Sequence, residues 1–223
     1  MPSVLRHALP ALAPLAPAVA ARLHLPRTIP TAAGAVALTF DDGPHPEGTP
    51  AILAILAAAG LEATFFLVGE QVERRPALAG EIAAAGHAIG LHGYRHRCQL
   101  RLTADEIAED YRRGAAAIED ATACAPELHR PPYGIYSGAG LKAARAAQLR
   151  PLLWSKWGRD WRKFTTPARI VARATETIAG GDVILLHDAD FYSSRGSHRR
   201  TAKALPLLIA ELKRRELGTV LPV

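Results

Sequence analysis

The stretch AVALTFDDGP, residues 35–44, decides the fold prediction. Residues 35–40 form an apolar run of the length of a buried strand, and the acids and Gly-Pro pair that follow mark its end. A helix is predicted over residues 50–59, because Pro50 suits a first helical turn and Gly60 suits a helix stop. The chain after Pro30 therefore opens with a strand–helix unit.

The same alternation continues to the C-terminus. Further strands are predicted at 63–68, 87–91, 127–130, 151–154, 182–186 and 219–221, with helices at 76–85, 103–121, 139–148, 166–179 and 201–215. About seven strand–helix units in alternation predict a parallel sheet with helices outside it. Such a sheet either closes as a barrel or stays open and doubly wound. Polar residues that follow five of the strands favour a barrel, whose active site lies at that end.

The chain is predicted to hold one α/β domain, over residues 31–223, because no linker or low-complexity break divides it. Residues 1–30 are predicted to form a separate leader or arm. Residues 18–20 (Ala-Val-Ala) resemble a signal-peptide cleavage site, but three prolines interrupt the apolar stretch before them. That stretch is also too short to span a membrane. The compartment is left open between the cytoplasm and the cell envelope or exterior.

Composition excludes several classes of protein. The 223 residues are 49% hydrophobic and 22% charged, which suits a folded domain with a sizeable core and argues against disorder. The net charge is +6, but the basic residues are dispersed and carry no nucleic-acid motif, so we expect no nucleic-acid partner. The two cysteines, Cys98 and Cys124, show neither zinc-ligand spacing nor a disulfide framework.

Two clusters together predict a metal site. Asp41 and Asp42 directly follow the first strand, where adjacent carboxylates are costly to hold without a cation or a shared proton. One of them can bind a metal while the other accepts a proton. His92 and His96, after the third strand, lie about one helical turn apart, roughly 6 Å, which is close enough to share one ion. Taken alone, each cluster has a plainer interpretation: a polar turn for the acids and a polar surface for the histidines.

Three later motifs also stand at strand ends. Arg130 opens the motif RPPYG, residues 130–134, where it can pair with a catalytic carboxylate and where a rigid turn can present a backbone N–H to an oxyanion. His187 ends an apolar strand and is a candidate general acid, which Asp160 can orient and whose pKa it can raise. Trp161, beside Asp160, can supply an apolar wall to a sugar or acyl group.

The five motifs, in this order, resemble those of the polysaccharide deacetylases, also called the NodB-homology domain or carbohydrate esterase family 4. The resemblance spans about residues 36–223. It implies a distorted (β/α)7 barrel in a single domain and a divalent metal, most often zinc, with cobalt, manganese or nickel as alternatives. It also implies an acetylated carbohydrate as substrate and, for this chain, we expect a monomer without a membrane span.

The resemblance assigns a role to each matching residue. The metal ligands would be Asp42, His92 and His96, with Asp41 as general base and His187 as general acid. Arg130 would keep Asp41 ionised, Asp160 would orient His187, and the Tyr133 backbone N–H would form part of the oxyanion hole. The substrate pocket would be lined by Pro132, Trp161 and Leu185.

Two positions depart from the family pattern. Gly93 stands where members usually carry a Ser or Thr whose hydroxyl braces the metal loop, and Trp157 stands where an acid usually precedes the Asp-Trp pair. The predicted function is hydrolysis of N-acetyl groups on a sugar or polysaccharide resembling chitin oligomers or peptidoglycan. An O-acetyl esterase acting on a xylan-like glycan and a carbohydrate-binding relative without activity are the alternatives.

Overall fold

β1 (Ala35–Asp41) is the central strand of a curled parallel sheet. The computed structural model describes residues 9–30 and 32–222. β1 pairs in parallel with β2 (Thr64–Leu67) on one side and with β7 (Val183–His187) on the other. The sheet order is β5-β4-β3-β2-β1-β7-β6, and the short β8 (Gly218–Thr219) also pairs with the start of β1.

The remaining strands are short. β3 spans Ala88–Leu91, β4 spans Leu128–His129, β5 spans Arg150–Pro151 and β6 spans Lys156–Trp157. All the paired strands run parallel, as expected for strands joined by helical crossovers. The curled, helix-covered sheet confirms the prediction of a distorted barrel in a single α/β domain.

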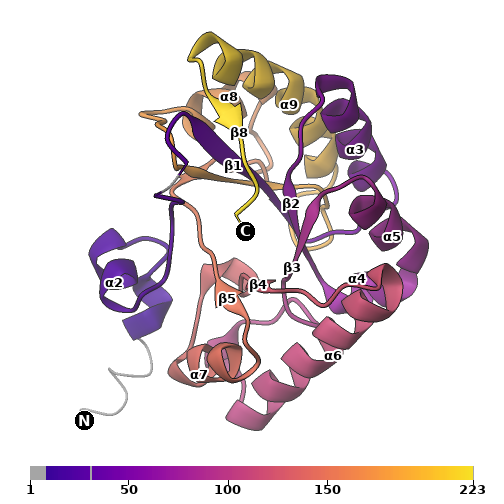
Figure 1. Ribbon diagram of the computed structural model, residues 1–223, viewed down its shortest axis with the longest axis vertical. Helices are drawn as coiled ribbons and strands as arrows, with labels where there is room; N and C mark the ends of the chain where they lie inside the picture. The colour runs from indigo at the N-terminus through magenta and orange to yellow at the C-terminus, as the bar shows by residue number, and fades with distance from the viewer. Residues whose placement is uncertain (1–8, 31, 223) are drawn as a thin grey trace.

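The helices lie in an arc outside the sheet (Figure 1). The larger ones are α3 (Gly48–Ala59), α5 (Pro76–Ala84), α6 (Ala104–Thr122), α7 (Gly138–Ala146), α8 (Pro167–Ala174) and α9 (Ser197–Arg214). α6 begins with a capping box, in which Thr103 and Glu106 each accept a backbone N–H of the other. No helix among residues 9–30 and 32–222 combines the length and apolar composition of a membrane span.

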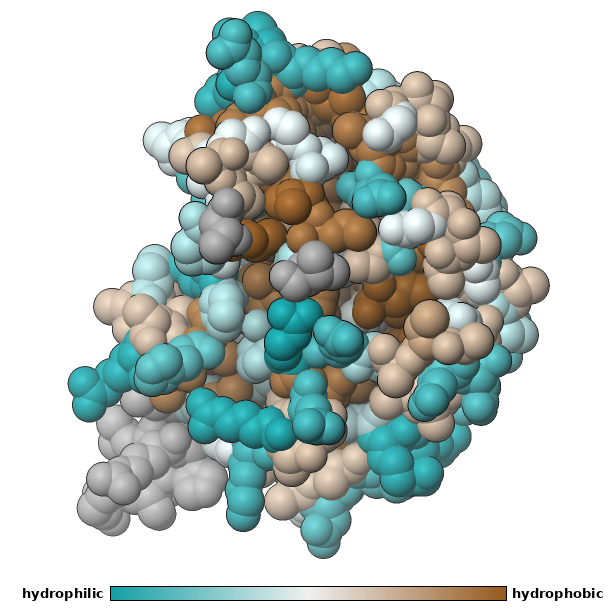
Figure 2. Space-filling view, viewed as in Figure 1, coloured by the Kyte–Doolittle hydropathy of each residue, from teal (hydrophilic) through white to brown (hydrophobic). Residues whose placement is uncertain are grey.

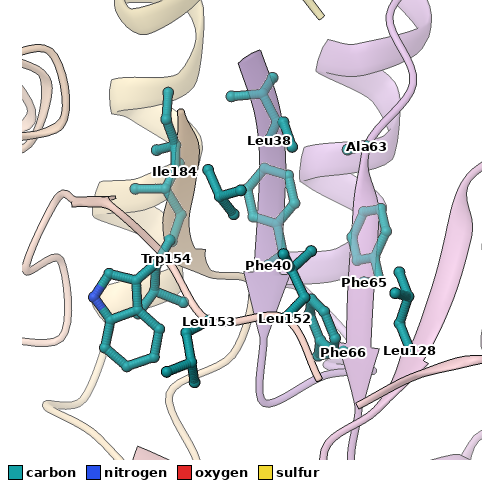
Figure 3. Packing of buried hydrophobic residues seen from close by; sticks show 14 of the residues in the cluster. Leu38, Phe40, Ala63, Phe65, Phe66, Leu128, Leu152, Leu153, Trp154 and Ile184 are labelled. Carbon is teal, nitrogen blue, oxygen red and sulfur yellow. The ribbon is translucent and has the colours of Figure 1, made fainter. Parts of the chain in front are cut away.

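The core fills the space between the sheet and these helices. The Phe40 and Phe65 rings stack with their centres 5.1 Å apart, and Leu38 and Ile184 pack nearby on the neighbouring strands β1 and β7 (Figure 3). Each of these side chains is fully buried, which stabilises the fold by roughly 1.5–3 kcal/mol per large apolar side chain. On the face drawn in Figure 2, hydrophobic side chains gather near the centre and hydrophilic ones mainly toward the edge.

Residues 9–30 pack against the barrel, with a 3₁₀ turn at Leu9–Leu12 and a short helix, α2 (Pro17–Arg22). Ala20 and Leu25 are buried in the common core. The backbone N–H of Leu153 donates to the Pro26 carbonyl at 2.8 Å, so this segment runs beside the loop between β5 and β6, where strand pairing is interrupted. That residues 1–30 form a leader or arm stays a prediction, and its residues 1–8 lie outside the described chain.

Several predicted boundaries were wrong. The strand predicted at 151–154 is only β5, and the two-residue β6 was missed because two residues carry no periodic pattern. The helix predicted at 166–179 ends at Ala174, and α9 begins at Ser197 instead of residue 201, after Gly196 at φ +74°. The sequence analysis also missed α4 (Gly69–Arg74), which is separated from α5 by Arg75 in a non-helical conformation (φ −144°, ψ 57°).

Candidate active site and metal centre

The predicted site residues meet at the carboxyl edge of the sheet. Asp41 and His187 end neighbouring strands and are paired in register, so they face the same edge. A cavity of about 230 Å³ opens there, and Asp41, Asp42, His92, His96 and His187 all line it. A larger hollow of about 550 Å³, between residues 24–30 and the β4–β5 edge, holds none of these groups, so we place the site in the smaller cavity.

Asp42, His92 and His96 surround a single point. Asp42 Oδ1 lies 3.4 Å from His92 Nε2 and 3.3 Å from His96 Nε2. This carboxylate oxygen is buried and accepts no hydrogen bond from the described residues. A buried, unpartnered carboxylate oxygen is costly unless a cation completes it. Two imidazoles and one carboxylate within 4.8 Å of one another therefore fit a divalent ion such as zinc.

The protonation of these groups suits metal binding. Burial lowers the pKa of His96 to about 4 against the opposing charge of Asp42, so its imidazole is neutral at pH 7. Burial would raise the pKa of Asp42, but its contact with His92 and the charges of His187 and His96 lower it to about 2. His92 Nδ1 lies 2.7 Å from the Arg130 carbonyl oxygen, to which it donates its hydrogen. Its Nε2 lone pair is consequently directed at Asp42.

Asp41 faces a fixed positive charge. Arg130 is fully buried, and its Nη1 donates to Asp41 Oδ1 at 2.7 Å and to Thr39 Oγ1 at 2.8 Å. Its other nitrogens donate to the carbonyls of Leu152 and Leu153, both at 2.9 Å. The guanidinium is thus held rigidly on one carboxylate oxygen. The second carboxylate oxygen of Asp41, Oδ2, lies 3.9 Å from His92 Nε2 and faces the candidate metal ligands.

His187 is held from behind by Asp160. Asp160 Oδ1 accepts from His187 Nδ1 at 2.9 Å, and Oδ2 accepts the His187 backbone N–H and the Thr201 hydroxyl, both at 2.7 Å. Burial opposes the charged imidazole, yet the charge and hydrogen bond of Asp160, with the charges of Asp42 and Asp41, raise the pKa of His187 to about 10. His187 is therefore an imidazolium at neutral pH, with Nε2–H free to donate a proton.

The turn after β1 is shaped by close packing. Asp42 has φ +82°, a left-handed conformation that is costly for a non-glycine residue and typical of functional sites. A Cβ at Gly43 would collide with the Asp188 carboxylate, so only glycine fits there. Asp188 is fully buried and accepts a hydrogen bond from Thr49, and burial raises its pKa to about 7.

The loop that carries His96 is braced by an acid from α6. Asp110 Oδ2 accepts the Tyr94 N–H at 2.7 Å, and Oδ1 accepts the Arg95 N–H at 3.2 Å. Gly93 has φ +82°, and a Cβ there would lie 2.9 Å from Asp110 Oδ2. The sequence marked Gly93 as the loss of a bracing hydroxyl, and in the structure this buried carboxylate braces the loop.

Aromatic side chains form much of the cavity wall. Of the three residues expected to line the substrate pocket, Trp161 and Leu185 do line it, whereas Pro132 is buried and does not. Tyr133, which was expected to contribute its backbone N–H, also lines the cavity. Tyr133 lies at φ +63° in the RPPYG turn, with its side chain 56% exposed. Trp154, Trp157 and Tyr192 also line the cavity and were not predicted as site residues. Only Trp157 had a signal, as the aromatic residue at the family's acidic position.

A curled parallel barrel with two imidazoles, two acids and an acid-backed histidine at its carboxyl edge defines a class of hydrolases that use a divalent metal. Within that class, the chain belongs to the polysaccharide deacetylase family. The family model described as polysaccharide deacetylase matches residues 28–152, which confirms the resemblance found in the sequence. The family depends on a divalent metal, and the three residues around Asp42 Oδ1 are its candidate ligands here.

Known relatives span most of the chain. A peptidoglycan-N-acetylglucosamine deacetylase of Bacillus cereus is 34% identical over 182 residues, covering 80% of this chain and 82% of the relative. A chitooligosaccharide deacetylase of Azorhizobium caulinodans is 30% identical over 185 residues, covering 80% and 88%. The crystal structure of a peptidoglycan N-acetylglucosamine deacetylase with a naphthyl-substituted N-hydroxybenzamide superposes with a TM-score of 0.80 at 32% identity, covering 87% and 88%.

Proposed function

We propose that this protein is a metal-dependent deacetylase that hydrolyses the N-acetyl groups of N-acetylglucosamine units in an oligosaccharide or polysaccharide and releases acetate. The observation that carries the proposal is Asp42 Oδ1, which lies between His92 and His96 and accepts no hydrogen bond from residues 9–30 and 32–222. Asp41 and the charged His187 line the same cavity. The named relatives support the N-acetylglucosamine and chitooligosaccharide substrate class.

Asp42, His92 and His96 would hold the metal, and zinc suits two imidazoles and one carboxylate with open positions. When bound, such an ion acts as a Lewis acid on the acyl carbonyl and lowers the pKa of a water molecule. That the metal is zinc and that the protein acts as a monomer are part of the proposal.

The chain's own side chains would move the protons. Asp41 accepts a proton from the water that attacks the acetyl carbon, while Arg130 fixes the direction of its carboxylate. The Tyr133 N–H donates to the oxyanion that forms. His187 gives its Nε2 proton to the amide nitrogen as the carbon–nitrogen bond breaks, leaving acetate and a free amine.

The cavity walls suit a sugar that carries a small apolar acyl group. Trp154, Trp157 and Trp161 form a chain of aromatic rings, with ring centres 5.8 Å and 5.4 Å apart, and Trp161 contacts His187 edge-on at 5.4 Å. Aromatic faces and the Leu185 side chain can pack against a methyl group and a sugar ring, while the polar groups face the scissile bond.

The test measures metal content and acetate release together. Asp42→Ala is expected to abolish both, whereas Asp120→Ala, an exposed acid on α6, is expected to change neither. Acetate release is screened over chitooligosaccharides, peptidoglycan fragments, small N-acetyl sugars and acetylated xylan, with zinc or cobalt added. Full acetate release by Asp42→Ala would overturn the site assignment, and release from acetylated xylan alone would show an O-acetyl esterase instead.

A further inference from the structure

The loop between β7 and α9, residues 188–196, places Tyr192 over one of the metal ligands. The Tyr192 and His96 rings are stacked with their centres 4.2 Å apart and their planes only 8° from parallel. Tyr133 meets His96 edge-on from another direction, at 4.6 Å and 69°. His96 is therefore held between two aromatic side chains, of which Tyr192 covers its face.

His96 needs this support because, among the residues that the structure describes, it has no equivalent of the hydrogen bond that orients His92. Metal-binding histidines normally donate their second ring hydrogen to a carbonyl or carboxylate, which fixes the ring. His92 does so through Nδ1 to the Arg130 carbonyl. His96 Nδ1 is buried and makes no hydrogen bond to another residue of the described chain, its polar contact being with its own backbone. The parallel ring of Tyr192 covers the face of the His96 imidazole and, together with the edge contact of Tyr133, restricts its rotation.

Tyr192 is itself fixed to the barrel. Its hydroxyl donates to Glu70 Oε1 at 3.0 Å and accepts from Gln71 Nε2 at 3.1 Å, both on α4. Gln71 is buried, so its amide is a firm anchor. The two ends of the Tyr192 side chain thus connect α4 to the loop after β7.

A second histidine cluster anchors that same loop. Asp190 Oδ1 lies 3.2 Å from His45 Nε2, and its Oδ2 accepts the Gly196 N–H at 2.6 Å and lies 3.2 Å from His198 Nδ1. This cluster has the spacing of a metal site. However, His45 Nδ1 accepts the backbone N–H groups of Glu47 and Gly48, so its Nε2 carries the ring hydrogen and donates to Asp190. A ring nitrogen that carries hydrogen cannot bind a metal, so the cluster fastens the loop.

We propose that Tyr192 is a positioning residue, whose ring holds His96 in the orientation that binds the metal and takes the place of the missing hydrogen bond. The proposal rests on the proposed function in one respect, because it takes His96 as a metal ligand. Lost outer contacts of a ligand typically weaken metal affinity about 10–100-fold. We therefore expect Tyr192→Leu to weaken zinc binding by this factor.

The experiment compares Tyr192→Leu with Tyr192→Phe, which keeps the ring and removes only the hydroxyl. Zinc affinity of the metal-free full-length protein is measured by competition with a chromophoric chelator, without substrate. Tyr192→Phe should bind zinc within about threefold of the wild type, and Phe164→Leu, a change at an 82% exposed aromatic residue, should leave the affinity unchanged. The visible spectrum of the cobalt-loaded protein should change in Tyr192→Leu and be retained in Tyr192→Phe.

His96→Ala separates failure of this proposal from failure of the proposed function. If His96→Ala loses zinc while Tyr192→Leu binds it as the wild type does, the positioning role is refuted and the metal centre stands. Equal losses of zinc affinity in Tyr192→Leu and Tyr192→Phe would also overturn the positioning role of the ring, since the hydroxyl would then account for the effect. Unchanged zinc affinity in His96→Ala would overturn both proposals. Circular dichroism of each metal-free variant verifies that the change in affinity is not a loss of fold.

Discussion

Replacing Asp160 by Asn tests whether charge behind His187 makes it the general acid. Asn has nearly the same shape, and its oxygen can still accept the His187 N–H and the Thr201 hydroxyl that Asp160 Oδ2 accepts. Its NH₂ group then faces His187 Nδ1, where Asp160 Oδ1 accepts a hydrogen bond at 2.9 Å. Two hydrogen-bond donors cannot face each other, so the doubly protonated imidazolium is disfavoured.

The size of the effect follows from the pKa of His187. Burial lowers this pKa, and Asp160 is the first of the charges that raise it to about 10. Without that charge we expect a pKa near or below the ordinary value of about 6.5. At pH 8 the protonated fraction would then fall from nearly all of the enzyme to a few per cent, or about 30–100-fold. A bound cation offsets Asp42 and Asp41, but it leaves the contribution of Asp160 in place.

The assay is kcat/KM for acetate release by the zinc-loaded enzyme between pH 5.5 and 10. Asp160→Asn is expected to lose activity as pH rises through about 6–7, whereas the wild type keeps its acid form to higher pH. Thr201→Val, which removes only the hydroxyl donor to Asp160 Oδ2, is the matched control and should keep the wild-type profile within about one pH unit. An alkaline limb in Asp160→Asn that coincides with the wild-type limb would refute the reasoning.

Three further outcomes are expected. In the metal-free protein, the free energy of unfolding should fall by up to about 5 kcal/mol as pH rises from 6.5 to 10, because folded His187 keeps a proton that the unfolded chain loses. Urea titrations at several pH values measure this dependence, and His187→Gln should remove most of it. Gly93→Ser, although it restores the family's residue, should lower stability by about 1–2 kcal/mol, since φ is +82° and the new Cβ crowds Asp110. Thermal unfolding tests this against Gly218→Ala, where the nearest atoms to a new Cβ lie 3.9 Å away. Asp110→Ala should weaken zinc binding about 10-fold or more, because the Tyr94 and Arg95 N–H groups on the His96 loop lose their acceptor. Calorimetry compares this variant with the control Asp120→Ala, and equal zinc affinities in the two variants would contradict the prediction.

The sequence predicted the parts of the site that lie on or next to strands. Asp41 and His187 end long apolar runs, so the pattern located both the strands and the edge at which they meet. His92 and His96 were predicted as ligands from their spacing together with the two acids at a matching strand end. In contrast, β6 is two residues long and was missed, although it leads into the loop that carries Asp160. Asp160 was predicted as part of a motif that follows the strand predicted at 151–154, whereas the strand that directly precedes its loop is β6.

The supporting contacts were beyond the reach of the sequence for a physical reason. Asp110 lies in α6, where an acid among other polar residues resembles a solvated helix face, and only the packing of α6 against the loop turns it inward. Tyr192 lies in a loop whose path depends on the anchoring of Asp190 to His45, two residues 145 positions apart in the chain. Periodicity describes local structure, so it carries no information about which loop covers which ligand.

Arg130 contacts both Asp41, the proposed general base, and His92, one of the candidate metal ligands. Its side chain fixes Asp41, while its backbone carbonyl accepts the ring hydrogen of His92. Both contacts come from one residue directly after β4, so any shift of that strand moves the proposed general base and one candidate ligand together. The other candidate ligand, His96, is supported by different residues, Tyr192 and the Asp110 brace. The two histidines of the candidate metal centre are thus supported by different residues, and removing one set of contacts should leave the orientation of the other histidine intact.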